Sequence, residues 1–147
     1  MKLKSSLAGA LLAACFALTL SACGGGGSDS YNSVVVANPA AFTKTDTVLG
    51  TGVEAVTGKT VTVAYTGWLY SATTADHKGT QFESNTYTFT IGKKEAIDGF
   101  DQGVLGMKVG GKRTVLIPSS MAYGTSGYNS IPPNAGLVFD LTLTAVQ

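Results

Sequence analysis

Cysteine and histidine are nearly absent from this sequence. The two cysteines, Cys15 and Cys23, both lie in the first 23 residues, and His77 is the single histidine. The rest of the chain therefore cannot hold a disulfide, a cysteine-based zinc site or a thiol nucleophile. Asp76 and His77 stand in a polar segment that we interpret as a surface loop, since one histidine and one aspartate do not make a metal site. We expect neither a metal nor another cofactor.

Charged residues are also scarce. Asp, Glu, Lys and Arg make up 13 % of the chain, and the formal net charge is +1 at pH 7. A nucleic-acid-binding domain needs a basic surface, and a solvating tail needs a charge excess, so we expect no nucleic-acid partner. The 147 residues are enough for one domain and a tail, but not for two domains.

The N-terminal residues have the pattern of a targeting segment. Two lysines precede the run LAGALLAACFALTL (residues 7–20), which is as long as a signal-peptide core and too short to span a membrane. It ends in Leu20-Ser21-Ala22-Cys23, which resembles the bacterial lipobox, where small residues precede a cysteine that receives lipid. We therefore predict a lipoprotein signal peptide at residues 1–22 and lipid attachment at Cys23. A plain secretory signal with an idle Cys23 is the alternative.

A linker is expected after the signal peptide. Gly24 to Gly27 form a run of four glycines, and residues 31–42 mix a valine run with a proline. We interpret residues 23–42 as the lipidated cysteine and a flexible tether, and a loosely attached first strand is the alternative for residues 31–42. Several acyl chains would anchor the protein to the bacterial envelope, on the periplasmic side or the cell surface. Without residues 1–22 the chain keeps 8 basic and 9 acidic residues, so anchoring would rest on lipid rather than charge.

Residues 43–147 have mainly the pattern of β-strands. Apolar and polar side chains alternate in segments 60–69, 86–91, 114–117 and 137–144, with Gly, Asn and Ser clusters between them. One segment differs, because Ile97, Phe100, Val104 and Met107 fall at steps of three and four, which predicts a short helix. The pattern indicates an α+β domain in which an antiparallel sheet buries its apolar face against one helix.

Aromatic side chains occur where a loop is expected. Tyr123 and Tyr128 stand in the glycine-rich segment 121–136, ahead of Pro132 and Pro133, although such loops are mostly polar. Core filling is the alternative explanation for any single aromatic residue of the domain, and these two tyrosines fit it least. Their position suggests the wall of a ligand-binding cleft.

Seven short motifs follow one another between Thr43 and the C-terminus. They are Val63-Ala-Tyr-Thr-Gly67, Gln81-Phe-Glu-Ser84, Phe89-Thr-Ile-Gly92 with Ala96-Ile-Asp-Gly-Phe100, Gly106-Met-Lys-Val-Gly110, Ala122-Tyr-Gly124, Ile131-Pro-Pro133 and Leu137-Val-Phe-Asp140. Together, in this order, they resemble the FKBP-type peptidyl-prolyl cis–trans isomerases. The resemblance implies a twisted antiparallel half-barrel wrapped around one short helix, with the ligand cleft between them.

The resemblance also implies a function and a set of site residues. It implies an enzyme that accelerates the rotation of X–Pro bonds in folding or secreted proteins by binding the twisted amide in an aromatic cleft. The residues that it assigns to catalysis are Tyr65, Glu83, Ile97, Phe100, Tyr123 and Phe139, and those that it assigns to substrate binding are Phe82, Tyr87, Ala96, Tyr128 and Ile131. The implied partners are proline-containing polypeptides and macrolide inhibitors, and we expect a monomer.

Three features depart from the commonest pattern of the family. Phe100 often corresponds to tryptophan, which would make the floor of the cleft shallower here, and Glu83 often corresponds to aspartate. The segment Ser71–Lys78 is an apparent insertion. The two substitutions leave a second interpretation open, in which the same fold serves as a non-catalytic binding module or chaperone for proline-containing segments.

Overall fold

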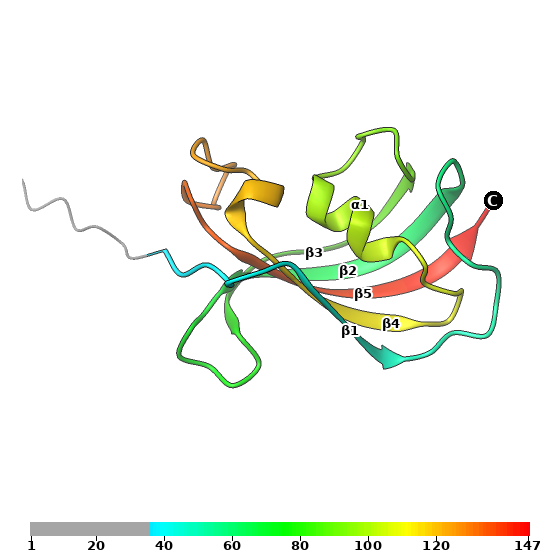
Figure 1. The fold of residues 1–147 in the computed structure, drawn as a ribbon, viewed down its shortest axis with the longest axis horizontal. Coiled ribbons are helices and arrows are strands. Elements are labelled where there is room, and N and C mark those ends of the chain that lie inside the picture. The colour runs from blue at the N-terminus through cyan, green and yellow to red at the C-terminus, as the bar shows by residue number, and fades with distance from the viewer. Residues whose placement is uncertain (1–35) are drawn as a thin grey trace, which may run out of the picture. The chain divides into compact units, whose positions relative to one another are not determined.

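The structure is a computed structural model, and it describes residues 36–147. The predicted signal peptide and Cys23 lie outside these residues. Within them, the chain forms one α-helix, one 3-10 helix and five strands (Figure 1). The elements are β1 (Thr43–Val48), β2 (Thr60–Tyr70), β3 (Lys78–Thr90), α1 (Asp98–Val104), β4 (Lys112–Ile117), η1 (Ser119–Met121) and β5 (Leu137–Val146).

The five strands form one antiparallel sheet in the order β1-β4-β5-β2-β3. Figure 1 shows α1 lying across one face of this sheet. The sheet and its single short helix are the architecture that the sequence pattern predicts. No helix in the described residues is long and apolar enough to span a lipid bilayer.

The two faces of the sheet follow the alternation of the sequence. Val61 and Val63 of β2 are completely buried, because they point toward α1. On the other face, Thr62 Oγ1 lies 3.0 Å from the Thr88 hydroxyl of β3, and a similar contact of 3.2 Å joins Thr60 and Thr90. The sheet therefore has an apolar inner face and a hydroxyl-rich outer face, as expected for a one-sided sheet.

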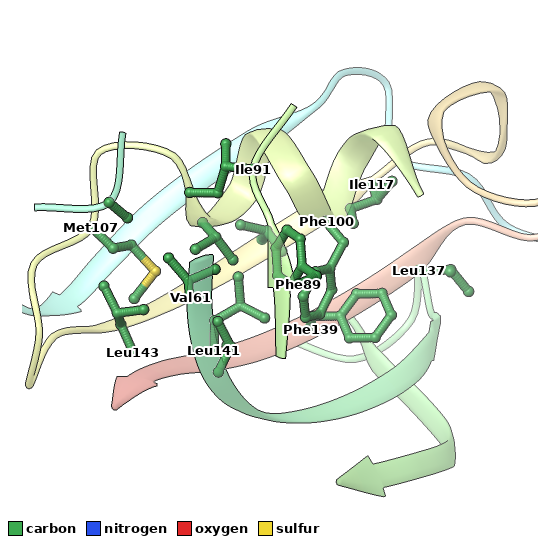
Figure 2. Packing of buried hydrophobic residues seen from close by; sticks show 14 of the residues in the cluster. Val61, Phe89, Ile91, Phe100, Met107, Ile117, Leu137, Phe139, Leu141 and Leu143 are labelled. Carbon is green, nitrogen blue, oxygen red and sulfur yellow. The ribbon is translucent and has the colours of Figure 1, made fainter. Parts of the chain in front are cut away.

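Three phenylalanines from different elements meet in the core, as Figure 2 shows. Phe100 of α1 lies 5.6 Å from Phe89 of β3 and 5.4 Å from Phe139 of β5, measured between ring centroids. The helix can approach the sheet closely because Gly99 has no side chain, and a Cβ there would lie 2.2 Å from Ile117 of β4. The close approach places Phe100 within reach of the strands on both sides.

The alternation of side chains misses one strand, β1, and the first half of another, β3. All six residues of β1 are exposed, so the strand has no buried face that a period of two could reveal. β3 begins at Lys78 rather than at residue 86. The sequence pattern does not reveal its first half, because that half is also almost entirely exposed. The helix ends at Val104, earlier than the apolar spacing suggests, and Met107 is buried from the following turn.

The strand β3 lies at an edge of the sheet, and side chains bond to two of its amides. The Thr86 N–H donates to Asn85 Oδ1 and the Thr90 N–H donates to Glu95 Oε2, both at 2.8 Å. An edge strand with free amides can pair with another chain, and acceptors of this kind reduce that tendency.

The predicted insertion forms the turn between β2 and β3 and is attached to the outer face of the sheet. Lys78 Nζ lies 2.6 Å from Asp140 Oδ2 and 4.5 Å from the centre of the Trp68 ring. His77 stacks on Tyr70, with ring centroids 5.1 Å apart. No group of three residues in the described chain could hold a metal ion, and His77 belongs to a surface turn.

Residues 36–42, here called the strap, contact the domain ahead of β1. Val36 and Phe42 are partly buried against the core, and Pro39 is buried. The Gly136 N–H donates a hydrogen bond of 3.1 Å to the Ala37 carbonyl. The predicted linker, residues 23–42, thus ends in a segment that packs on the loop before β5.

Candidate active site

A cleft of about 290 Å³ opens on the inner side of the sheet, between α1, the strands and the loop 122–136, here called the wall loop. The residues that line it come from β2, β3, β5, α1, the segment before α1 and the wall loop. They are Tyr65, Phe82, Glu83, Tyr87, Glu95, Ala96, Ile97, Phe100, Tyr123, Tyr128 and Phe139.

Edge-to-face contacts between aromatic rings form the floor and sides of the cleft. The ring of Phe100 lies 5.3 Å from Tyr65 at an interplanar angle of 81°, and 5.4 Å from Phe139 at 87°. Phe82 in turn meets Phe139 at 5.6 Å and 88°. Such contacts fix ring orientation as well as burying area. Gly67 is required here, because a Cβ would lie 2.5 Å from the Phe82 ring.

The Tyr65 hydroxyl remains protonated over a wide pH range. Burial, the largest effect, and the negative charge of the nearby Glu83 carboxylate together raise the pKa of Tyr65 to about 12. Glu83, which stands where aspartate is common, thus keeps a carboxylate close enough to the Tyr65 hydroxyl to raise its pKa. Burial and Glu83 also raise the pKa of Tyr123. Both hydroxyls are therefore neutral hydrogen-bond donors at physiological pH.

The segment before α1 is held by Glu95. Its carbonyl accepts a hydrogen bond of 2.8 Å from the Tyr87 hydroxyl, and its carboxylate accepts one from the Thr90 amide. Ile97 follows at the N-cap position of α1, where its carbonyl accepts bonds from two helix amides. The Ile97 N–H donates to no group of the described residues, so it is free to bind a carbonyl oxygen in the cleft.

The wall loop carries the two tyrosines that the sequence places in an apparent loop. Tyr123 lines the cleft, and Tyr128 lies at its rim with 56 % of its surface exposed. Backbone bonds of 2.9 and 2.8 Å between Tyr128 and Ile131 close a tight turn in the loop. Gly127 has a φ of 66° in this turn, and a Cβ there would lie 2.5 Å from the Ile131 carbonyl oxygen, so the turn needs glycine.

The structure brings ten of the predicted site residues into one cleft and leaves Ile131 out of its lining. Ile131 is 5 % exposed and joins the hydrophobic core beneath the wall loop, because the turn points its side chain inward. Glu95 lines the cleft but was not predicted, although its place directly before Ala96 and Ile97 was a usable signal. Cys23, the predicted lipid attachment site, lies outside the described residues.

Comparisons with known proteins agree with this geometry. The model of the FKBP-type peptidyl-prolyl cis-trans isomerase family matches residues 52–144. FK506-binding protein 1B of Neurospora crassa is 44 % identical over 105 residues, which cover 68 % of this chain and 93 % of the relative. An FK506-binding protein of Neisseria meningitidis is 46 % identical over 103 residues, covering 66 % of this chain and 88 % of the relative.

Solved structures show the same fold. The crystal structure of AtFKBP13 superposes with a TM-score of 0.62 at 34 % identity, covering 75 % of this chain and 96 % of that one. FkpA from Escherichia coli gives 0.61 at 32 % identity, covering 72 % of this chain and 48 % of FkpA. The family match, the identities and the aromatic cleft agree with one another, and the chain therefore belongs to the FKBP-type peptidyl-prolyl cis–trans isomerases.

Proposed function

We propose that this chain rotates X–Pro bonds by holding the twisted imide in the cleft above Phe100. The observation that carries the proposal is the convergence of four rings, those of Tyr65, Phe82, Phe100 and Phe139, on one hollow. A proline ring is compact and apolar, and it would rest on Phe100 with the other three rings around it. This placement leaves the amide bond that precedes the proline at the mouth of the hollow.

The physical basis lies in the resonance of the amide. Rotation about an X–Pro bond crosses a barrier of roughly 18–20 kcal/mol, and unassisted exchange takes tens to hundreds of seconds. At the perpendicular geometry the amide loses resonance and its oxygen becomes less polar. An apolar, ring-lined hollow therefore binds the twisted amide better than either planar form, and a site that prefers the transition state accelerates the reaction.

Two donors would hold the peptide while one half of it turns. The free N–H of Ile97 and the hydroxyl of Tyr123 are both placed to bind substrate carbonyl oxygens, and both are neutral. Fixing the carbonyl on one side of the bond leaves the other side free to rotate. The role needs no nucleophile and no general base, since no covalent bond is formed or broken.

The test is a protease-coupled assay with a proline-containing peptide, with and without the macrolide FK506. The names of the relatives describe binding of FK506, and we propose that the same cleft accepts it here. We expect a rate above the uncatalysed background and its loss at saturating FK506. Binding of FK506 without a rate above background would instead favour the non-catalytic module, and absence of both would reject the placement of the cleft.

We also propose that the protein acts as a monomer anchored by lipid on Cys23 to the bacterial envelope. The lipobox-like Leu20-Ser21-Ala22-Cys23 and the glycine run after it support this proposal. Labelling of the full chain with a radioactive fatty acid in a bacterial host tests it, with Cys23→Ser as the variant. We expect label and membrane recovery only with Cys23, and equal label in both chains would contradict it. Sedimentation of the domain tests the proposed monomeric state, and a mass of two chains would contradict it.

A further inference from the structure

A closed ring of hydrogen bonds holds the two ends of the wall loop. The Ser119 N–H donates to Asn38 Oδ1 at 2.8 Å, and the Gly124 N–H donates to the Ser119 carbonyl at 2.9 Å. The Asn134 N–H donates to the Gly124 carbonyl at 2.7 Å, and Asn38 Nδ2 donates to the Asn134 carbonyl. Asn38 thus closes a ring whose other three members belong to η1 and the wall loop.

Asn38 is suited to this position by its chemistry. It lies 81 residues before Ser119 and 96 before Asn134, so it joins parts of the chain that sequence does not bring together. A primary amide carries a donor and an acceptor on one planar group, and the ring uses one of each. Aspartate would keep the acceptor for Ser119 but would place a negative oxygen against the Asn134 carbonyl.

The strap holds Asn38 in place on both sides. The preceding residue, Ala37, accepts the Gly136 N–H, and the following residue, Pro39, is buried. Gly136 packs so tightly on the strap that a Cβ there would lie 2.5 Å from Pro39 Cδ. The Asn38 side chain is therefore presented to the wall loop from a fixed backbone, although the residue itself is exposed.

The ring bears directly on the cleft. Tyr123 immediately precedes Gly124, and the segment between Gly124 and Asn134 contains Tyr128. Both ends of that segment have left-handed backbones, with φ of 55° at Gly124 and 60° at Asn134. A non-glycine residue adopts this conformation at some energetic cost, so Asn134 needs fixed partners to keep it. Loosening the ring would let the Tyr123 hydroxyl shift relative to Ile97.

We infer that Asn38 is a positioning residue for the isomerase, which orients Tyr123 through the ring without touching the substrate. The strap is then a working part of the domain, although the family match begins only at residue 52. The inference rests on the proposed role of Tyr123 in binding substrate. It assigns to the end of the predicted linker a task in substrate recognition.

The experiment compares Asn38→Ala and Asn38→Asp with the parent chain, and uses Asn85→Ala as the matched control. Asn85 is likewise an asparagine whose side chain accepts a backbone N–H, but it sits on the outer edge of β3. The measurements are kcat and KM in the peptide assay, thermal unfolding, and hydrogen exchange of individual amides by NMR. The double variant Asn38→Ala with Tyr123→Phe completes a double-mutant cycle, which measures the coupling between the two residues.

For both Asn38 variants we expect kcat/KM to fall about three- to tenfold, mainly through KM, as for the loss of one or two net hydrogen bonds. The amides of Gly124 and Asn134 should exchange faster, while those of β2 and β5 keep their protection. In the Tyr123→Phe background, Asn38→Ala should lower kcat/KM by less than twofold, because both substitutions act through the Tyr123 hydroxyl. Asn85→Ala should match the parent in kcat/KM and in the exchange of the Gly124 and Asn134 amides.

Three results would overturn the inference. They are parent-like KM and exchange in Asn38→Ala, faster exchange throughout the sheet together with a lower melting temperature, and full additivity in the cycle. The first result would show that the ring does not hold the wall loop. The second would show that Asn38 only stabilises the fold. The third would show that Asn38 does not act through Tyr123. If the parent chain lacked isomerase activity, the proposed function would fail, whereas exchange at Gly124 and Asn134 would still test the ring.

Discussion

The rings of Tyr123 and Tyr128 lie nearly parallel, 5.0 Å apart between centroids and 12° between planes. The outer ring of Tyr128 covers the inner ring of Tyr123, which faces the cleft. The glycines and prolines of the wall loop shape its turns, and the two rings give it a solid surface. This pairing explains why a segment with the composition of a loop carries two large aromatic side chains.

Removal of the Tyr123 hydroxyl should weaken catalysis without disturbing this pair of rings. In Tyr123→Phe the stack on Tyr128 is kept and one donor to the substrate is lost, so we expect kcat/KM to fall about three- to tenfold. The protease-coupled assay measures it. Tyr70→Phe, which removes a hydroxyl on the outer face, serves as the control, and equal rates in all three proteins would argue against a role of Tyr123.

Substitution of Phe100 should separate binding from stability. Phe100→Ala leaves a cavity among Tyr65, Phe89 and Phe139, and we expect a loss of about 3–5 kcal/mol in the free energy of unfolding. Phe100→Leu preserves much of the volume and should cost less than about 1.5 kcal/mol. Both variants lack the flat floor, so both should bind FK506 more weakly.

Urea denaturation measures the stability of the Phe100 variants, and a surface variant at the opposite end of α1 serves as the control. Leu105, at the C-cap of α1, is 37 % exposed, and Leu105→Ala should change the free energy of unfolding by less than about 1 kcal/mol. Parent-like FK506 affinity in a folded Phe100→Leu protein would show that Phe100 is not the floor of the ligand site.

Tyr65 should ionise later than an ordinary tyrosine. Its pKa is raised to about 12, so between pH 10 and 12 the unfolded chain loses this proton while the native state keeps it. Stability must therefore fall as pH rises through that range. Ultraviolet titration follows the ionisation of the tyrosines. The urea midpoint should decline less with rising pH in Tyr65→Phe than in the parent. Identical alkaline profiles would contradict the raised pKa.

The buried Arg113 side chain, which pairs with the exposed Asp46, should make a large contribution to stability. Arg113 is 7 % exposed and bonds to Asp46 at 2.6 and 3.1 Å, and to the carbonyls of Gly103 and Leu105 at 2.8 and 3.0 Å. It thereby joins β1, β4 and the end of α1. We expect Arg113→Met to lose about 2–4 kcal/mol by urea denaturation, since two carbonyls and a carboxylate lose their partner.

The same pair predicts the behaviour of the protein in acid. The hydrogen bond from Arg113 is the main cause of the lowered pKa of Asp46. A carboxyl with a lowered native pKa stabilises the fold above its unfolded pKa, and that contribution disappears as pH falls through the native value. Asp46→Asn should therefore be less stable than the parent at neutral pH and show a weaker decline below about pH 4. A steeper decline would reverse the sign of the argument.

The sequence alone predicts the elements whose side chains have one buried face. Val61 and Val63 alternate with threonines, and the structure confirms that they are buried. Phe100 was placed correctly because helical spacing and the family motif agree. Ile131 belongs to the same set of motifs but faces the core, since motif order gives a position in the chain and not the direction of a side chain in a turn.

Other features leave no periodic trace in the sequence. The strand β1 is exposed throughout and is held by pairing with β4, which a local pattern cannot reveal. Asn38 acts through bonds to residues more than eighty positions away, and an exposed asparagine before a proline resembles any linker residue. Such long-range bonds between a side chain and the backbone depend on the complete fold.

The acceptor that Glu95 supplies to β3 has a consequence for the release of a client protein. Phe82, Glu83 and Tyr87 of this strand line the cleft, so an unfolded client held there lies close to an open sheet edge. Because its Thr90 amide is already bonded to the Glu95 carboxylate, β3 is a poorer template for pairing with another strand. The client can thus dissociate after each isomerisation instead of becoming a sixth strand.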